Sequence, residues 1–228
     1  MNRTAALIMA AGTGGRFGPG EPKQFRKLNG CPTLGWAVRI FSDIEKVESV
    51  SIVIAPGLEQ AAAGLVEDHG LKKVRNIVPG GKTRQESVRL GLEELADTVE
   101  YVLVHDAARP CVSRDLIERV CKALESCNAV VPVMPAVDTL VREVDNAVDA
   151  ILDRNRIAAV QTPQGFRAEL LLRAHKRAVS QGLLSSDDGS LVLAMGELVG
   201  TIPGEARNIK ITYPEDMKVA EAILSSSI

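Results

Sequence analysis

The residue types best suited to chemistry lie in a glycine loop near the amino terminus. An apolar run at residues 5–9 leads into Gly12 and Gly14, with Arg16 in the same loop and Lys23 seven residues later. Glycines let backbone N–H groups surround phosphate oxygens, and arginine and lysine side chains neutralise the phosphate charge. This combination predicts a binding site for the triphosphate of a nucleotide.

Two better-known phosphate-binding loops do not fit this sequence. A dinucleotide-binding G-x-G-x-x-G loop needs a third glycine where Phe17 stands, and Asp43 closes a predicted helix instead of ending a second strand. Residues 81–83 (Gly-Lys-Thr) match the tail of a P-loop, but Asn76 occupies the place of its first glycine. We therefore expect neither NAD-dependent oxidoreduction nor P-loop chemistry.

Polar residues also follow the third and fourth predicted strands, where ligands bind in parallel sheets. Gly80 and Gly81 let a flat base lie against the backbone, and Arg84 and Ser87 can hydrogen-bond the base edge or the ribose. Asp106 ends the fourth strand, where a carboxylate can hold Mg²⁺ or a ribose hydroxyl.

Three later clusters could bind a second phosphate. They contain Arg154, Thr162 and Lys210, and Arg154 and Lys210 together suit a phosphomonoester. His105 is expected to be structural, as a packed, hydrogen-bonded side chain. Residues 187–188 (Asp-Asp) could be a second acidic contributor to the site, but we favour their interpretation as the start of a helix, where acidic residues are common.

The candidate residues favour nucleotidyl transfer over hydrolysis through a protein nucleophile. The sequence offers no Ser-His-Asp grouping, reactive cysteine setting or zinc spacing. A phosphomonoester is largely dianionic at neutral pH, so it can attack an α-phosphorus without a general base. The enzyme must then align the reactants and neutralise charge, which Arg16, Lys23 and Mg²⁺ could do.

Composition limits the classes of protein to consider. The chain has 228 residues, 46% hydrophobic and 25% charged, which suits one globular domain over residues 1–228. The net charge of −2 and the pI of about 6.0 argue against binding to nucleic acid or an anionic membrane. No apolar run reaches about 18 residues and no secretory signal pattern is present, which predicts a cytoplasmic protein. The four cysteines lack metal-site spacing, so we expect free, mostly buried thiols.

Short apolar runs alternate with helix-length amphipathic segments along the whole chain. This rhythm predicts an α/β fold, a single Rossmann-like domain with a mixed, mostly parallel sheet and helices on both faces. The expected strands are residues 5–9, 50–55, 74–78, 101–105, 129–134 and 198–202, with a further short element at 208–212. The expected helices are residues 32–42, 58–68, 83–95, 114–125 (capped by Ser113), 168–180, 187–194 and a last one from 214.

One segment interrupts this rhythm. Residues 139–144 and 148–152 alternate apolar and polar side chains on either side of a turn at 145–146, as in a β-hairpin. The interruption predicts an arm at residues 137–156 that projects from the domain.

Together these motifs closely resemble the 2-C-methyl-D-erythritol 4-phosphate cytidylyltransferase family, over essentially the whole chain and in the family's order. The resemblance rests on Ala10-Ala11-Gly12 with Arg16 and Pro22-Lys23-Gln24, the block from Gly80 to Val88, the run from His105 to Pro110, Asp138-Thr139, Asp153-Arg154-Asn155, Thr162-Pro163-Gln164 and the run from Asn208 to Thr212.

The resemblance implies a nucleotidyltransferase of the non-mevalonate isoprenoid route. It would transfer CMP from CTP to 2-C-methyl-D-erythritol 4-phosphate and release pyrophosphate, with Mg²⁺ held mainly by the CTP phosphates and Asp106 as a further candidate ligand. By resemblance, Arg16 and Lys23 stabilise the transition state, and Arg154 and Lys210 position the substrate phosphate. The implied nucleotide-binding residues are Ala10, Ala11, Gly12, Gly14, Gly80, Gly81, Arg84, Ser87, Asp106 and Ala107, and the implied substrate-binding residues are Asp106, Arg109, Thr139, Arg154, Thr162 and Lys210.

The family also implies a homodimer in which the arms are exchanged between protomers. Arg109, Thr139 and Arg154 would then complete the neighbour's pocket.

Two alternatives stay open. Ribitol 5-phosphate cytidylyltransferases have very similar loops but usually carry Gly-Val where residues 107–108 are Ala-Ala, which favours the first interpretation. A catalytically silent nucleotide-binding module would be expected to have lost Arg16 or Lys23, and both are present. The chain departs from the family at Gly189, usually alanine, and at Lys82, acidic in some members.

Overall fold

The computed structural model describes residues 3–12, 14–18, 20–95 and 98–226 of the chain. The strands are β1 (Thr4–Ala10), β2 (Lys27–Leu28), β3 (Cys31–Pro32), β4 (Val47–Ile54), β5 (Val74–Pro79), β6 (Tyr101–Asp106), β7 (Ala129–Pro135), β8 (Leu140–Val144), β9 (Ala147–Leu152), β10 (Ala158–Val160), β11 (Gln164–Arg167) and β12 (Gly200–Pro203). The helices are α1 (Thr33–Ser42), α2 (Glu59–Asp68), α3 (Arg84–Glu93), α4 (Arg114–Ala123), α5 (Ala168–Gln181), α6 (Asp188–Leu193) and α7 (Asp216–Ser225), with 3₁₀ turns η1 (Gly15–Phe17) and η2 (Arg154–Arg156).

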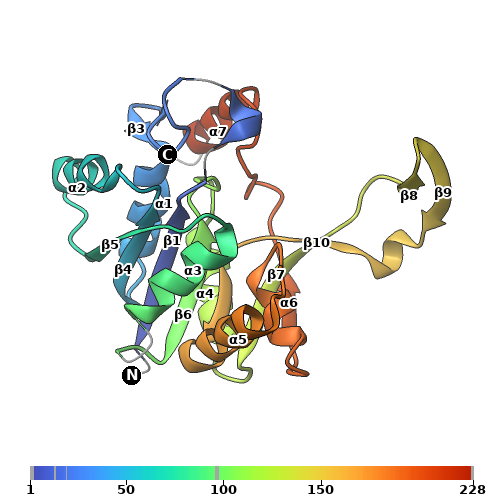
Figure 1. Ribbon diagram of the computed structural model, residues 1–228. Coiled ribbons are helices and arrows are strands. Elements are labelled where there is room, and N and C mark those ends of the chain that lie inside the picture. Colours follow the sequence, from blue (N-terminus) through green and yellow to red (C-terminus); the bar gives the residue numbers. More distant parts are fainter. Residues whose placement is uncertain (1–2, 13, 19, 96–97, 227–228) are drawn as a thin grey trace.

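One mixed sheet forms the centre of the molecule (Figure 1). Its strand order is β10-β7-β11-β6-β1-β4-β5, and β12 pairs with β7. β1 runs parallel to β4 and β6, β4 is parallel to β5, and β12 is parallel to β7. β10 and β11 are the antiparallel members. The predicted α/β fold with a mostly parallel sheet is confirmed.

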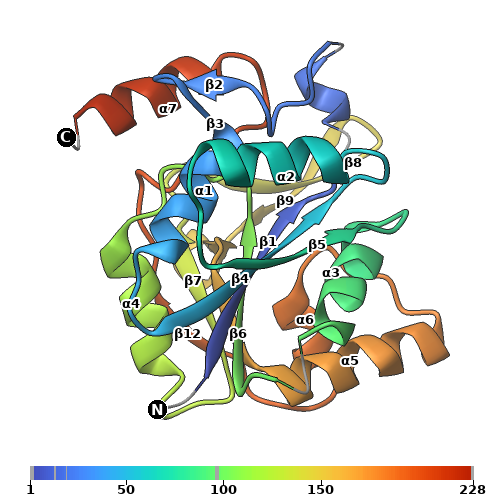
Figure 2. The same cartoon turned by 90° about the vertical axis from the view of Figure 1, so that its left-hand side faces the viewer.

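Helices cover both faces of this sheet because successive side chains of a buried strand point to opposite faces. Along β1, Ala6, Ile8 and Ala10 pack into a core shared with α1, α2 and α4. The intervening Leu7 and Met9 pack into a second core with α3, α5 and α6. Figure 2 shows α1 and α4 on one side of the sheet and α3, α5 and α6 on the other.

Side-chain caps set the first turns of several helices. The hydroxyl of Ser113, the predicted cap of α4, accepts a hydrogen bond from the Leu116 amide. Thr83 caps α3 in the same way, and Asp187 caps α6. Asp43 ends α1, as predicted.

A third, smaller core joins the two ends of the chain above the sheet. Phe17 and Leu28 from the amino-terminal part pack there with Ile211 and with Leu224 of α7. This core holds the loop that carries Lys23 against the segment between β12 and α7. The element predicted at residues 208–212 is neither helix nor strand, which corrects that prediction.

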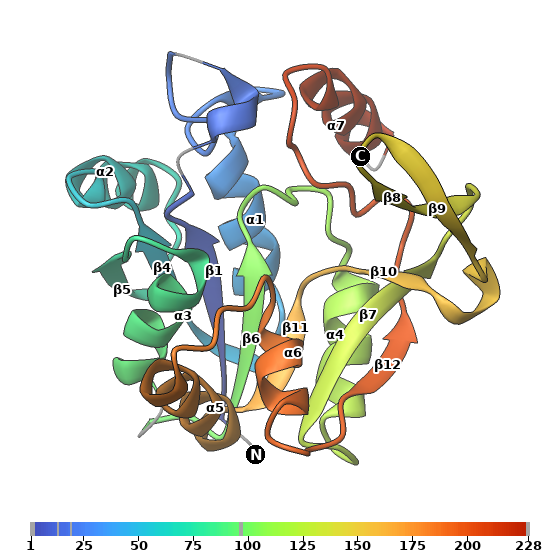
Figure 3. The same ribbon diagram turned by 45° about the vertical axis from the view of Figure 1, so that its right-hand side comes forward.

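The predicted arm is present. β8 and β9 form an antiparallel hairpin whose turn residues, Asp145 and Asn146, both have positive φ, as a two-residue hairpin turn of this type requires. Figures 1 and 3 show the hairpin standing away from the body of the molecule.

Two further predictions concern the chain as a whole. All four cysteines are free, three of them buried and Cys127 partly so, as predicted. Within the part of the chain that the structure describes, no helix has the length and apolar character needed to cross a membrane.

Candidate active site

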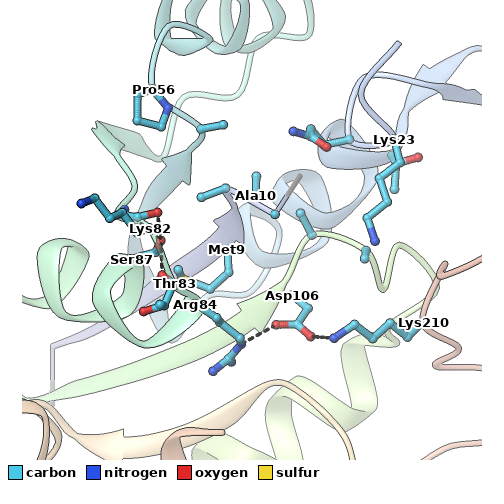
Figure 4. A pocket seen from close by; sticks show the side chains of 18 residues that line it. Met9, Ala10, Lys23, Pro56, Lys82, Thr83, Arg84, Ser87, Asp106 and Lys210 are labelled. Atoms are coloured by element: carbon cyan, nitrogen blue, oxygen red, sulfur yellow. Dashed lines mark hydrogen bonds and ion pairs between the residues drawn. The ribbon is translucent and has the colours of Figure 1, made fainter. Parts of the chain in front are cut away.

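A cleft of about 400 Å³ opens beyond the carboxyl ends of β1, β4, β5 and β6, the place expected for a ligand in such a sheet. It is lined by Met9, Ala10, Ala11, Gly12, Lys23, Gln24, Thr33, Ala55, Pro56, Gly81, Lys82, Thr83, Arg84, Ser87, Asp106, Ala107, Ala108 and Lys210. In Figure 4, Lys82, Thr83 and Ser87 lie at one end of the cleft. Lys23, Asp106 and Lys210 lie toward the other end.

Most of the predicted site residues meet in this cleft. Those that line it are Ala10, Ala11, Gly12, Lys23, Gly81, Arg84, Ser87, Asp106, Ala107 and Lys210. Those that do not line it are Gly14, Arg16, Gly80, Arg109, Thr139, Arg154 and Thr162. Thr13 of the same loop lies outside the described residues.

Two of the predicted glycines, Gly80 and Gly14, lie behind the residues that line the cleft. A Cβ on Gly80 would lie 2.5 Å from the Ala11 Cβ, so glycine is needed where the loop after β5 meets the loop after β1. Gly14 has φ of +67° and lies against the aliphatic stem of Lys23. These glycines therefore let the backbone loops approach one another and support Lys23.

Ser87 also shapes the loop after β5. Its hydroxyl is buried, accepts a hydrogen bond from the Gly81 amide at 3.0 Å and donates to the Thr83 carbonyl at 2.8 Å. The hydroxyl thus holds the Gly80-Gly81 backbone in place. Its predicted contact with a base stays a prediction.

A chain of ion pairs crosses the floor of the cleft (Figure 4). Lys210 Nζ lies 2.7 Å from Asp106 Oδ2, and Arg84 Nε lies 3.3 Å from Asp106 Oδ1. Burial alone would raise the pKa of Asp106, but the positive charges of Arg84 and Lys210 outweigh it and hold that pKa well below its ordinary value. Asp106 is therefore a carboxylate with a cation on each oxygen.

Lys23 adds a second cation beside Lys210. Its Nζ donates to the Ile211 carbonyl at 2.9 Å. Burial, and next the positive charge of Lys210, lower the pKa of Lys23, and the exposed Arg16 of η1 contributes in the same direction. The charge of Arg16 thus acts on Lys23, although Arg16 itself does not line the cleft.

His105 is structural, as predicted. It is fully buried, its Nε2 donates to the Arg109 carbonyl at 3.1 Å and its Nδ1 accepts from the Thr162 hydroxyl at 3.1 Å. The same hydroxyl accepts from the Asp106 amide, while Arg109 Nη1 donates to the Asn208 carbonyl. Burial lowers the pKa of His105 to about 4, so its ring is neutral. Thr162 and Arg109 therefore act in this chain as supports beneath Asp106.

Two buried residues, Asp188 and His175, extend this chain of ion pairs, and neither pairing was predicted from the sequence. Asp187 caps α6 as expected, but the neighbouring Asp188 is buried, with its Oδ2 2.8 Å from Arg84 Nη1. Its Oδ1 accepts from His175 Nε2 at 3.1 Å. The predicted helix start at residues 187–188 is confirmed, and Asp188 in addition pairs with Arg84. No local signal distinguishes the two aspartates, because the partners of Asp188 lie far away in the sequence.

The arm carries the remaining predicted residues. Arg154 is exposed on η2, where its Nη1 donates to the Val137 carbonyl at 3.0 Å, and Thr139 is exposed. Within one chain, therefore, the structure does not bring Arg154 to the cleft beside Lys210. The predicted joint contact of these two cations with a phosphate stays a prediction.

The donors for a metal ion fit poorly at this site. Among the described residues, no group of three or more His, Cys, Asp or Glu side chains is arranged to hold a metal ion. Both oxygens of Asp106 already contact cations, so this carboxylate does not fit as a ligand in the observed arrangement. An ion at this site would have to bring most of its ligands with the nucleotide.

Comparison with known proteins identifies the family. The family model described as IspD, 2-C-methyl-D-erythritol 4-phosphate cytidylyltransferase, matches residues 4–226. The enzyme of that name from Streptomyces avermitilis is 42% identical over 234 residues, covering 98% of this chain and 92% of its own. The one from Bacillus cytotoxicus is 38% identical, covering 96% of both. The crystal structure of the enzyme from Thermus thermophilus superposes with a TM-score of 0.83 at 39% identity, over 99% of this chain and 100% of that one. The chain therefore belongs to the 2-C-methyl-D-erythritol 4-phosphate cytidylyltransferase family.

Proposed function

We propose that this chain transfers the CMP group of CTP to 2-C-methyl-D-erythritol 4-phosphate through the cleft described above, and that it does so in the cytoplasm. As a member of its family it is a nucleotidyltransferase of isoprenoid biosynthesis, and CTP and 2-C-methyl-D-erythritol 4-phosphate are its substrates. The products are 4-diphosphocytidyl-2-C-methyl-D-erythritol and pyrophosphate.

The reaction is an in-line displacement at phosphorus. An oxygen of the substrate phosphate forms a bond to the α-phosphorus of CTP. The bond from that phosphorus to the oxygen bridging it to the β-phosphorus breaks, and pyrophosphate leaves with the bonding electrons. A phosphomonoester with a second pKa near 6 is mostly dianionic at neutral pH, so no protein base is needed. The chain's own residues must align the two anions and neutralise their charge.

One observation carries this assignment of roles: the glycine loop after β1 and the cations Lys23 and Lys210 open onto the same cleft. In our proposal, the backbone of Ala10, Ala11, Gly12 and Gly14 surrounds the triphosphate. Arg16 and Lys23 stabilise the charge that develops on the departing pyrophosphate. Lys210 leaves Asp106 to meet the substrate phosphate, and Asp106 is then available to the ribose. Exchange of one anion for another at Lys210 keeps this cation paired throughout.

We further propose that Mg²⁺ enters with CTP, bound mainly by its phosphate oxygens. Such an ion supplies charge neutralisation on the phosphates. The support for this proposal is the negative charge of the CTP phosphates. The protein offers little in their place, because the carboxylate of Asp106 is already paired with Arg84 and Lys210.

The test is a pyrophosphate-release assay with each of the four ribonucleoside triphosphates against 2-C-methyl-D-erythritol 4-phosphate, ribitol 5-phosphate and common sugar phosphates. We expect the highest kcat/KM for CTP with 2-C-methyl-D-erythritol 4-phosphate. Faster turnover of ribitol 5-phosphate would favour the alternative cytidylyltransferase, and binding of CTP without turnover of any acceptor would favour a silent module.

We also propose that the active unit is a homodimer with exchanged arms. The arm exposes apolar side chains that a second copy could cover, with Val137, Val148 and Ile151 exposed to 81%, 65% and 74%. Arg154 lies on the same arm and could reach the partner's Lys210 only through such an exchange.

Subunit mixing tests the exchange. Arg16→Ala and Arg154→Ala homodimers should each be nearly inactive. After random exchange half of the dimers are hybrids, each with one intact composite site, so activity should recover to about a quarter of wild type. No recovery, with hybrid formation verified by mass spectrometry, would show that each arm serves its own subunit.

A further inference from the structure

Two buried polar side chains, Asp188 and His175, lie behind Arg84 and outside the lining of the cleft. Asp188 begins α6 and His175 lies on α5, and each side chain is only 1% exposed. Neither lines the cleft. Both reach it only through the guanidinium of Arg84, which lies between the carboxylates of Asp188 and Asp106.

The geometry points to a positioning role, and we propose that Asp188 and His175 are positioning residues that hold Arg84 so that Asp106 presents a fixed carboxylate to Lys210 and the ribose. The proposal rests on the proposed function of the cleft. Contacts of 3.1, 2.8, 3.3 and 2.7 Å join His175, Asp188, Arg84, Asp106 and Lys210 in that order.

Charge balance explains why two carboxylates are needed. Without Asp188, the two cations Arg84 and Lys210 would share the single carboxylate of Asp106. Asp188 supplies the second negative charge, so Arg84 is neutralised from behind. Asp106 can then pair with Lys210 and release it to an incoming phosphate without drawing Arg84 further into the cleft.

The environment of His175 indicates that its polar function is to orient Asp188. Its Nε2 donates to Asp188 Oδ1, and its Nδ1 is buried without a hydrogen-bond partner among the described residues. Replacing a buried ion pair by well-packed apolar groups is often neutral for stability. A contribution to stability therefore does not by itself explain why polar groups stand at these two positions. The need for a fixed carboxylate next to the reacting phosphates does explain it.

A matched pair of variants separates positioning from packing. His175→Gln keeps an N–H donor that can reach Asp188, whereas His175→Leu has similar bulk and no donor. We expect kcat to fall about tenfold in His175→Leu, with KM for CTP changed by less than about threefold, and kcat of His175→Gln to stay within about threefold of wild type. Equal kcat in the two variants, whether both high or both low, would overturn the proposal.

A double-mutant cycle tests the path through Asp106. Asp188→Asn should lower kcat by about 100-fold in the wild-type background but by less than about threefold when combined with Asp106→Asn. Multiplicative effects would show that Asp188 acts independently of Asp106. Glu93→Gln is the control, because it breaks the Arg89–Glu93 pair on α3 away from the cleft and should leave kcat within about twofold.

Crystal structures of the variants give a result that does not depend on whether the proposed function is right. Crystal structures of the two His175 variants should show the Arg84–Asp106 contact retained with glutamine and lost with leucine. An unchanged contact in His175→Leu would overturn the positioning role, even if the wild-type protein transferred no cytidylyl group. Because both variants keep Asp188, they also decide the matter if Asp188→Asn fails to fold.

Discussion

The buried ring of His105 should make the stability of the protein depend on pH in a window that lies mostly above the ordinary pKa values of carboxylates. The ring is fully buried and neutral, with a pKa of about 4 in the folded chain against an ordinary value of 6.5. As the pH falls below 6.5, the unfolded chain binds a proton at this position and the folded chain does not. Protonation therefore favours the unfolded state, and the free energy of unfolding decreases between pH 6.5 and 4.

The size of the effect follows from the two pKa values. Each pH unit between them is worth about 1.4 kcal/mol, so the loss reaches about 3 kcal/mol by pH 4. This is a large fraction of the 5–15 kcal/mol typical of a folded domain. The buried Asp106 and Asp188 have lowered pKa values, so the stability they add is complete above their ordinary pKa of 3.8 and is lost only below it. The two contributions occupy different pH ranges.

Urea denaturation between pH 7.5 and 4 measures this directly. The wild-type curve should fall by about 3 kcal/mol relative to that of His105→Gln, whose side chain does not titrate. The comparison uses the slope against pH, so a uniform loss of stability in the variant does not affect it. Parallel curves for the two proteins would refute the inference that His105 is held neutral by burial.

Two further substitutions test a cation in the cleft and a glycine behind its lining. Lys23→Ala should lower kcat by about 10²- to 10³-fold and weaken CTP binding much less, because in the proposed mechanism this cation acts mainly on charge that develops in the transition state. The exposed Lys72→Ala is the control, and unchanged kcat in Lys23→Ala would remove Lys23 from the mechanism. Gly80→Ala should destabilise the chain by about 1–3 kcal/mol in urea denaturation, because the new Cβ would lie 2.5 Å from that of Ala11. The control is Gly64→Ala, in the interior of α2, where the added methyl has open space around it. It should leave stability unchanged or raise it by up to about 1 kcal/mol. Equal losses of stability in the two variants would show that the contact between Gly80 and Ala11 is not the cause.

The sequence predicted the parallel part of the sheet well, because buried parallel strands are short apolar runs. Residues 5–9 and 101–105 were expected as strands, and β1 and β6 extend these ranges by a residue or two. β11, at residues 164–167, is absent from the strands predicted from the sequence. It is only four residues long, follows Thr162-Pro163 and begins with a polar side chain, so it has neither the length nor the pattern of a buried strand.

Site residues could likewise be predicted only where a local sequence pattern pointed to their chemistry. Gly80, Asp106 and Lys210 belong to local motifs whose residue types already suggest phosphate or ribose chemistry. Asp188 had a sufficient local explanation as part of a helix start. Its pairing with Arg84 depends on how α3 and α6 both pack against α5 in three dimensions. Burial of a charge by tertiary packing leaves no trace in a local pattern.

The irregular segment between β12 and α7 has a practical consequence for handling the protein. Lys210 lies there, held by the Ile211 amide bonded to the Ala108 carbonyl and by the buried Asn208, whose side chain donates to the Thr162 carbonyl. Among the described residues after Pro203, none belongs to a strand of the central sheet. A nick by a protease between Pro203 and Asp216 would thus cut the connection to α7 while sparing every β-ladder. Circular dichroism of such clipped material would look nearly intact, so purified batches are better checked by intact mass than by secondary-structure content.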